Sequence, residues 1–245
     1  MTEMIISDNQ ANATLPKILV TIIRLYLTIM VPILLTLASV RLVMTPLFLQ
    51  IEYNRPGFPV DDYGFTTEDR LEYAPYAINY LLNNADISYL GDLTFPNERP
   101  LYTNSELGHM EDVKVVTRLA FMILFIGGIA TAILIGYLLM QRTKQAKSII
   151  RRSLQDGALL TLGIIGFIVL TAVIAWDLFF DSFHGLFFES GTWRFAYSDT
   201  LIRLFPEQLW FDAAILIGVL TVTGAIVMLL LVWRWGKTNI DNTST

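Results

Sequence analysis

The chain contains two histidines, His109 and His184, and no cysteine. Histidine is the side chain whose ordinary pKa lies nearest neutrality, so these residues are the first candidates for moving protons between a nucleophile and a leaving group. The absence of cysteine excludes a thiol nucleophile, a disulfide and a thiolate metal site on this chain. Acid–base chemistry by two histidines is therefore the reaction type to consider first.

Carboxylates accompany both histidines at helical spacing. Glu106 and Asp112 lie three residues before and three residues after His109. Asp181 and Asp177 lie three and seven residues before His184. On a helix such neighbours share a face, where a carboxylate can orient an imidazole and stabilise its charged form. The candidate acid–base residues are His109, His184, Asp177, Asp181, Glu106 and Asp112.

Other interpretations of these residues stay open. Ser105 precedes His109 by four residues and could be a nucleophile activated by it. Alternatively, Ser105 is the N-cap of a helix with Glu106 in its first turn. Two histidines with nearby carboxylates could bind a metal, although the chain has no HExxH motif. Either histidine could also contact lipid headgroups without doing chemistry.

Four apolar segments are long enough to span a membrane. The chain is 54% hydrophobic and has a mean hydropathy of +0.53, which is typical of a polytopic membrane protein. A helix needs about 20 residues to cross the hydrocarbon core. The four segments cover about residues 18–40, 115–140, 157–180 and 209–233. We interpret the first as an uncleaved anchor, because it is long for a signal peptide.

The charges predict the orientation. The linker between the second and third segments contains Arg142, Lys144, Lys147, Arg151 and Arg152, and no acidic residue lies among these five. By the positive-inside rule this linker and both termini lie in the cytoplasm. The net charge of −5 and the lack of a basic exposed face exclude nucleic acid as a partner.

This topology brings the two histidines to one depth. The second span starts outside and the third ends outside, so His109 precedes one apolar run and His184 follows the other. At 1.5 Å per helical residue, each lies roughly 6–9 Å beyond the apolar run. The sequence therefore predicts that both histidines lie at the outer mouth of the bundle.

The long outer loop is acidic and is expected to form a cap. We expect a short strand over Leu47–Tyr53, because its hydrophobic residues alternate. Thr66 and Thr67, followed by acids, predict the start of a helix that Pro75 kinks or divides. This helix either packs on the bundle or lies at the interface to gather substrate.

The predicted fold class is an all-α integral membrane protein with four transmembrane helices and both termini in the cytoplasm. The predicted division is a cytoplasmic tail (1–16), transmembrane helix 1 (17–45), an extracytoplasmic cap (46–112), transmembrane helix 2 (113–140), a cytoplasmic basic loop (141–156), transmembrane helix 3 (157–180), an extracytoplasmic loop (181–208), transmembrane helix 4 (209–235) and a second cytoplasmic tail (236–245).

The short outer loop carries residues suited to a lipid substrate. Arg194 and Arg203 are expected to be free to meet a phosphate or a developing oxyanion, unless they pair with Glu189 or Glu207. Aromatic side chains there can hold acyl chains and exclude water. The candidate substrate-binding residues are Arg194, Arg203, Phe183, Phe187, Phe188 and Trp193.

Two segments resemble the bacterial lipoprotein intramolecular transacylase (Lit) family. They are "ELGHMEDVK" (106–114) and "WDLFFDSFHGLFFESGTW" (176–193) with its continuation "LIRLFPEQLWFD" (201–212). The matching positions are Glu106, His109, Met110, Asp112, Val113, Lys114, Asp177, Phe183, His184, Phe187, Phe188, Trp193, Pro206 and Glu207. The resemblance covers most of the chain, from about residue 24 to residue 235.

The resemblance implies acyl transfer within one substrate. A lipoprotein with a diacylglyceryl-modified N-terminal cysteine would pass its sn-2 acyl chain to its own α-amine, giving the lyso-form. The implied partners are diacylglyceryl-modified bacterial lipoproteins and membrane lipid, with no cofactor. The implied location is the cell membrane, with the active site on the extracytoplasmic face.

Two alternatives from other classes remain. A non-enzymatic lipid- or protein-binding module of the cell envelope would need neither histidine. A metal-dependent hydrolase at the outer face would use them as ligands. A transporter is disfavoured, because the spans lack paired midplane charges and an inverted repeat.

Overall fold

The computed structural model describes residues 15–241, and this part of the chain is helical throughout its regular structure. Its helices are α1 (Lys17–Val43), α2 (Pro46–Asn54), α3 (Thr67–Leu82), α4 (Ser88–Gly91), α5 (Asn104–Met140), α6 (Lys144–Ile174), α7 (Trp176–Phe187), α8 (Thr200–Leu204) and α9 (Glu207–Asp241). Within the described range the extended pairing is a single isolated bridge between Thr94 and Pro100.

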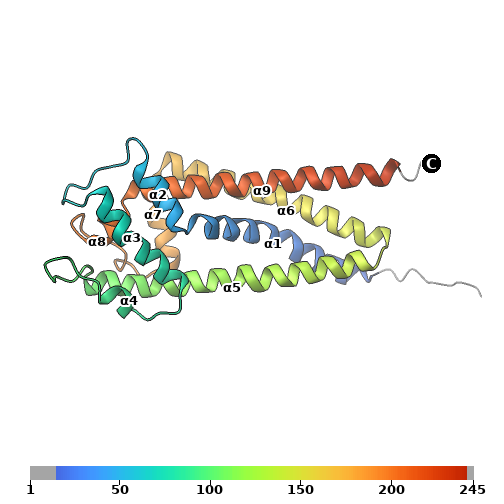
Figure 1. The fold of residues 1–245 in the computed structure, drawn as a ribbon. Helices are drawn as coiled ribbons and strands as arrows, with labels where there is room; N and C mark the ends of the chain where they lie inside the picture. The colour runs from blue at the N-terminus through green and yellow to red at the C-terminus, as the bar shows by residue number, and fades with distance from the viewer. Residues whose placement is uncertain (1–14, 242–245) are drawn as a thin grey trace, which may run out of the picture.

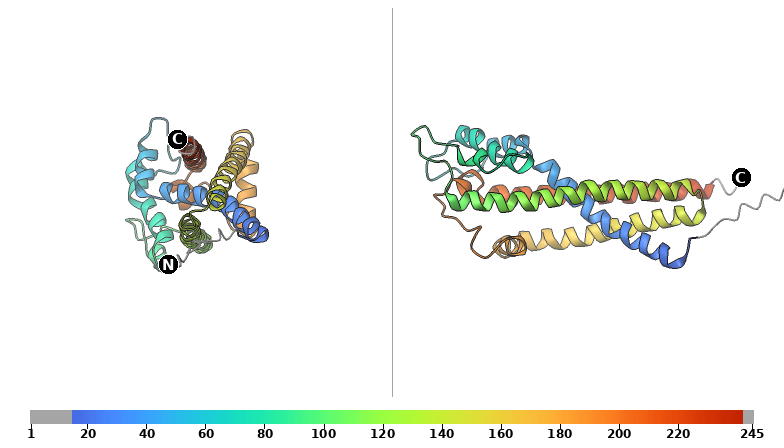
Figure 2. Two further views of the ribbon diagram at one scale, coloured as in Figure 1. Left: turned by 90° about the vertical axis from the view of Figure 1, so that its right-hand side faces the viewer. Right: turned by 90° about the horizontal axis from the view of Figure 1, so that it is seen from below.

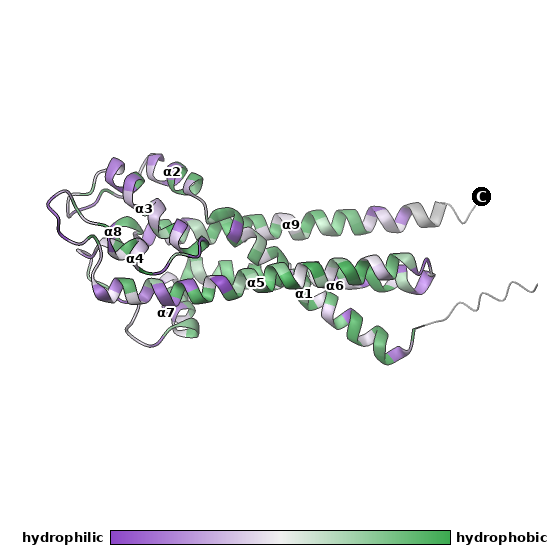
Figure 3. Ribbon diagram, turned by 60° about the horizontal axis from the view of Figure 1, so that its bottom comes forward, coloured by the Kyte–Doolittle hydropathy of each residue, from purple (hydrophilic) through white to green (hydrophobic). Residues whose placement is uncertain are grey.

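Four of the helices, α1, α5, α6 and α9, are long and apolar enough to cross a membrane. They lie side by side as a bundle, and the smaller helices gather at one end (Figure 1). The described chain begins and ends at the opposite end (Figure 1). Hydrophobic residues cover the helix shafts, and hydrophilic residues concentrate at the two ends (Figure 3). The predicted class, a four-span helical membrane protein, is confirmed.

The helices α1 and α6 pack closely where residue 157 is a glycine. A Cβ atom on Gly157 would lie 2.7 Å from the Cβ of Val31 and 2.9 Å from the carbonyl oxygen of Thr28. Contacts this short are not tolerated, so the missing side chain is what lets the two backbones approach. By contrast, no residue of α5 between Arg118 and Tyr137 is buried. In a membrane that stretch meets lipid over much of its surface.

The basic linker predicted as a loop is mostly helical. Only residues 141–143 separate α5 from α6, and Thr143 caps α6 by accepting a hydrogen bond from the backbone N–H of Ala146. The spacing of buried Ala146, Ile149 and Ile150 explains the difference. These apolar positions recur at helical intervals among the basic residues, so the charged face is solvated while the other face packs.

The third spanning helix ends earlier than predicted. It stops at Ile174 rather than continuing to residue 180, and Ala175 has a non-helical backbone (φ −144°, ψ 67°). The chain then turns into α7, which is seen end-on in the view where α6 lies along the page (Figure 2). The helix that carries the second histidine therefore crosses the end of the bundle instead of extending a span.

The cap is a small helical unit with its own core. The expected strand over 47–53 is wrong: this segment is α2, capped by Thr45 and started by Pro46. Its apolar residues satisfy helical as well as alternating spacing, and Leu49 and Tyr53, four apart, are the buried pair. The core it joins includes Tyr73, Ala77, Tyr80, Leu90, Leu101, Met110, Leu201, Leu204 and Phe205.

The predicted cap helix at 67–82 is present as α3. Thr66 and Asp69 form the two hydrogen bonds of a capping box at its start. Pro75 lies inside the helix without dividing it, between the buried Tyr73 and Ala77. The α3 helix therefore packs on the cap core.

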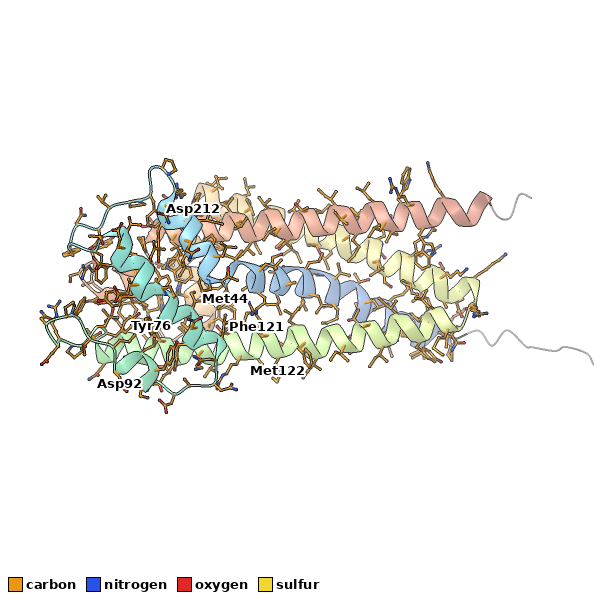
Figure 4. All side chains as sticks on the ribbon, in the orientation of Figure 1. Met44, Tyr76, Asp92, Phe121, Met122 and Asp212 are labelled. Atoms are coloured by element: carbon orange, nitrogen blue, oxygen red, sulfur yellow. The ribbon has the colours of Figure 1, made fainter. Side chains whose placement is uncertain are left out.

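An ion-pair cluster fastens the cap to the last span. Arg55 pairs with Glu52 of its own turn and with Asp212 of α9. Asp212 lies beside α2 at the junction (Figure 4). Gln208 also donates a hydrogen bond of 2.9 Å to Asp212. Because Glu52 is buried, its pKa is raised. This junction holds the cap over the end of the bundle.

Candidate active site

His109 lies in the first turns of α5, ahead of the apolar run that starts at Val115. Helix α5 begins at Asn104, with Thr103 as its N-cap and Glu106 completing a capping box. The N-cap is therefore Thr103 rather than Ser105, whose side chain is exposed. At 1.5 Å per residue, His109 stands about 9 Å outside the apolar run.

Glu106 is a structural residue. Its side chain is 1% exposed. One carboxylate oxygen accepts a hydrogen bond from the backbone N–H of Thr103 at 2.7 Å, and the other from the backbone N–H of Leu201 at 2.6 Å. Both oxygens are thus used to close the capping box and to tie α5 to α8. The expectation that Glu106 orients His109 is wrong.

His109 is enclosed by aromatic rings. Its side chain is 8% exposed, and its ring lies edge-on to Phe188 and Phe195, with centroid distances of 5.1 and 5.5 Å. Its Nδ1 atom is buried and has no hydrogen-bond partner. A buried polar atom without a partner costs free energy, so this nitrogen is available to a ligand.

His184 lies on α7 with one ring nitrogen committed. Its Nδ1 atom is 2.8 Å from the carbonyl oxygen of Phe180, one turn earlier. A carbonyl only accepts, so Nδ1 carries the hydrogen and Nε2 is left with the free lone pair in the neutral ring. The ring also stacks on Trp193, with centroids 4.7 Å apart and an interplanar angle of 29°.

The two histidines meet around one phenylalanine. Phe188 contacts the ring of His109 at 5.1 Å and that of His184 at 5.9 Å. Burial lowers the pKa of His109 to about 4, and the charge of His184 acts in the same direction. Burial also lowers the pKa of His184. Both imidazoles are therefore neutral near pH 7, and a positive charge on His184 would lower the pKa of His109.

The carboxylates do not orient the histidines as expected. Asp181 forms an ion pair of 2.8 Å with Arg194, and both side chains are about half exposed or more. Its charge opposes the lowering of the pKa of His184 only as a minor contribution. Asp177 is exposed on α7 instead of facing a partner inside a span. Asp112 is also exposed and acts on His109 through its charge alone.

Arg203 is not free to meet a substrate. Its side chain is 8% exposed, and its guanidinium bonds to Asp61 at 3.0 and 3.1 Å and to the carbonyl of Tyr63 at 3.1 Å. It also lies over the ring of Phe65, 3.7 Å from the centroid. The prediction that Arg203 binds substrate is wrong, because the cap supplies all of these partners. The alternative partners Glu189 and Glu207 are not the ones it uses.

The aromatic residues divide into two groups. Phe183 and Phe187 are 49% and 45% exposed on α7, so they can face lipid. Phe188 and Trp193 instead surround the histidines, and the indole Nε1 of Trp193 is buried with no partner. The sequence prediction named all four, but only the structure separates them.

Three further aromatic residues complete the site, and of these Phe195 was missed. Phe180 fixes the tautomer of His184 and contacts its ring at 4.1 Å. Phe195 covers His109, and Trp176 contacts Phe180 at 5.8 Å. The position of Phe180 one turn before His184 was a usable signal, whereas Phe195 lies in an irregular loop. Trp176 also has a buried Nε1 without a partner.

Metal-binding side chains do not converge within the described residues. No group of three or more His, Asp or Glu side chains in residues 15–241 is placed to hold an ion. Nδ1 of His184 is bonded to the carbonyl oxygen of Phe180, and Nδ1 of His109 is buried without a partner. What the site offers is a pair of neutral imidazoles and an unpartnered indole N–H in an aromatic setting.

A sequence model of the family described as lipoprotein intramolecular transacylase Lit matches residues 24–210. An uncharacterized protein of Aquifex aeolicus strain VF5 is 29% identical over 214 residues, which are 85% of this chain and 92% of that protein. The fold is similar to that of the membrane-integral lipoprotein intramolecular transacylase of Bacillus cereus, with a TM-score of 0.75, 21% identity, and coverage of 91% of this chain and 99% of that one. A histidine-to-alanine variant of the same Bacillus protein matches with a TM-score of 0.57 at 20% identity, over 90% and 95% of the chains.

Proposed function

This chain belongs to the lipoprotein intramolecular transacylase family of membrane acyltransferases, and we propose that it moves the sn-2 acyl chain of a diacylglyceryl-cysteine lipoprotein to the lipoprotein's own α-amine. The protein is a multi-pass protein of the cell membrane. We place the reaction on the extracytoplasmic face, because the positive-inside rule puts the basic end in the cytoplasm. The acyl chains of such a substrate lie in the membrane and its cysteine lies at the surface, the depth of His109 and His184.

The reaction is aminolysis of an ester. The amine nitrogen attacks the carbonyl carbon of the sn-2 ester, so a nitrogen–carbon bond forms and the bond to the glycerol oxygen breaks. The amine must lose a proton during attack, and the glycerol oxygen must gain one. No water, metal or other co-reactant enters this balance, and one base that returns its proton is sufficient.

His184 is the base in this proposal. The observation that carries it is the hydrogen bond between Nδ1 of His184 and the carbonyl of Phe180, which leaves Nε2 with a lone pair. Because burial lowers its pKa, the ring is neutral at physiological pH and ready to accept the amine proton. The same nitrogen then delivers that proton to the glycerol oxygen.

His109 and Trp193 stabilise the oxyanion. With a pKa lowered to about 4, His109 is a poor base. A neutral imidazole still donates one N–H, and such a donor can polarise a carbonyl. The indole of Trp193 supplies a second donor next to His184. Fixed donors aimed at the developing negative charge are a strong source of rate acceleration in a water-poor site.

The remaining predicted residues support this arrangement. Phe188 lies between the histidines and excludes water. Phe183 and Phe187 give α7 an apolar surface that can hold acyl chains. Arg194, held by Asp181 over the ring of Trp193, stands at the entrance where a polar headgroup or peptide would pass.

Single replacement of each histidine by glutamine tests the proposal. The wild-type and variant chains are expressed in a bacterial host that lacks its own lipoprotein N-acylation. The N-terminal peptide of a native lipoprotein is then analysed by mass spectrometry. We expect the lyso-form with the wild-type chain and at least a hundredfold less with either His109→Gln or His184→Gln. Undiminished lyso-form with both variants, at wild-type protein levels, would show that the histidines are not used.

A further inference from the structure

A second amphipathic site lies at the other end of the bundle, between α6 and α9. Figure 1 shows α6 leaning away from α9 toward its N-terminal end. A cavity of about 470 Å³ opens there, and its lining is apolar. The lining residues are Leu154, Gly224, Val227, Met228, Leu231, Val232 and Trp235. Its lining residues on α9 run from Gly224 to Trp235, about three turns of the helix.

A second cavity continues the first toward the helix ends. It measures about 440 Å³ and shares Val232 with the apolar cavity. Unlike the first, it contains cationic side chains, those of Arg151 from α6 and Lys237 from α9. No acidic side chain lines either cavity in the part of the chain that the structure describes.

The two cations are positioned by the helices that carry them. A Cβ on Gly236 would lie 2.8 Å from a terminal nitrogen of Arg151, so that guanidinium reaches across to the backbone of α9 because residue 236 has no side chain. The ammonium of Lys237 lies 4.0 Å from the ring centroid of Trp233. Tryptophan favours the membrane–water interface, which places both charges at headgroup depth.

We propose that this pair of cavities binds an anionic glycerophospholipid of the inner leaflet, with an acyl chain in the apolar cavity and the phosphate between Arg151 and Lys237. An apolar trough that ends in two cations, with no acidic side chain lining it among the described residues, complements a molecule with a long chain and a negative head. Basic pockets between transmembrane helices on the cytoplasmic side suit such headgroups. A zwitterionic or neutral lipid shares the chain but lacks the net charge.

The site is separate from the proposed acyl-transfer site. The site runs from Gly224, in the middle of α9, toward the end of the bundle where the described chain ends, opposite the cap (Figure 1). A lipid held here would bridge α6 and α9 where they diverge, and it would add stability through binding to the folded state alone. Its loss is therefore not expected to abolish acyl transfer.

Native mass spectrometry of the full-length, delipidated protein in detergent tests the proposal. Dioleoyl phosphatidylglycerol, dioleoyl phosphatidylcholine and dioleoylglycerol are each titrated onto the wild-type protein. We expect one high-affinity adduct with phosphatidylglycerol, bound at least tenfold more tightly than the other two. Equal affinity for phosphatidylglycerol and phosphatidylcholine would overturn the proposal.

Two variants address the headgroup and the chain separately. Arg151→Gln with Lys237→Gln is expected to lower phosphatidylglycerol affinity about thirtyfold, or about fivefold per charge, and to remove the preference over phosphatidylcholine. The control, Lys144→Gln with Lys147→Gln, removes the same charge from residues that line neither cavity. An equal loss in this control would show that only the general surface charge matters.

Val227→Trp fills the apolar cavity. Val227 is 48% exposed, so the larger ring is tolerated without disturbing helix packing. We expect this variant to lose both phospholipids, while Ile226→Trp, at a neighbouring exposed position outside the cavities, retains them. Retention of phosphatidylglycerol by Val227→Trp would exclude the acyl-chain half of the site.

Discussion

The Nδ1 atom of His184 donates its hydrogen to the carbonyl oxygen of Phe180, 2.8 Å away on the same helix. The partner that sets the tautomer is therefore a backbone group, which does not titrate. A carboxylate in this place would raise the pKa of the imidazole and hold it in its charged form more often. The carbonyl also raises the pKa of His184, but burial outweighs it, so the ring is neutral and its Nε2 can accept a proton.

The neutral histidines predict the pH dependence of acyl transfer. Both have lowered pKa values, so neither changes charge appreciably between pH 6.5 and 8. The substrate α-amine, with an ordinary pKa of about 8, must be neutral to attack. We expect kcat/KM to rise with pH through this range and to level off near the pKa of the amine. A titration of kcat/KM against pH checks this, and a separate inflection at the ordinary histidine pKa would contradict it.

Replacing Trp193 by phenylalanine tests the indole donor. The variant keeps an aromatic ring against His184 but removes the unpartnered N–H. We expect kcat to fall about 10²-fold with little change in KM, as for loss of one oxyanion donor. Trp210→Phe, at a 45% exposed position on α9, is the matched control. A Trp193→Phe enzyme with wild-type kcat would assign the indole a packing role only.

Replacing Glu106 by glutamine separates structure from catalysis. Glutamine can still complete the capping box with Thr103. However, it has one acceptor oxygen where the carboxylate uses two, so the N–H of Leu201 loses its partner. A buried unpaired N–H costs about 1–3 kcal/mol. We expect a lower melting temperature but an unchanged pH profile, with the exposed Glu111→Gln as control. A shifted pH profile in Glu106→Gln at unchanged stability would restore a role next to His109.

The Arg203–Asp61 pair should behave as a buried ion pair. Both side chains are at least nine-tenths buried. Removing one partner leaves an uncompensated charge, which costs about 3–5 kcal/mol. We expect Arg203→Met and Asp61→Asn each to lower stability strongly, and the double variant to lose less than the sum. Thermal unfolding of all four proteins measures the coupling. If Arg203→Met kept full stability and lost only activity, substrate binding would be the better explanation.

The four spans, and the meeting of the two histidines at one end of the bundle, could be predicted because both follow from the lengths and order of the apolar runs. An apolar run of at least 20 residues forms a membrane helix almost regardless of its neighbours, and topology then fixes which ends face outward. His109 and His184 were placed together on that basis. Their contact through Phe188 depends on the turn at Ala175. This turn could not be predicted, because no glycine or proline marks it in the sequence.

Long-range partners could not be predicted. Arg203 bonds to Asp61, 142 residues earlier, and no local pattern identifies that pair. The strand expected at Leu47–Tyr53 failed for a different reason. The spacing of Leu49 and Tyr53 fits both a strand and a helix. Thr45 as N-cap and Pro46 as first residue favour the helix, which is the structure that forms.

Because α7 lies across the end of the bundle, we expect the rate of acyl transfer to depend on bilayer thickness. His109 is carried on a helix that crosses the membrane, so its height is set by where the apolar part of α5 settles. His184 is carried on α7, whose exposed Leu178, Phe183, Leu186 and Phe187 settle at the surface of the hydrocarbon. In a bilayer that is too thick or too thin, these two heights shift relative to one another. We therefore expect acyl transfer in reconstituted vesicles to pass through an optimum as lipid chain length is varied.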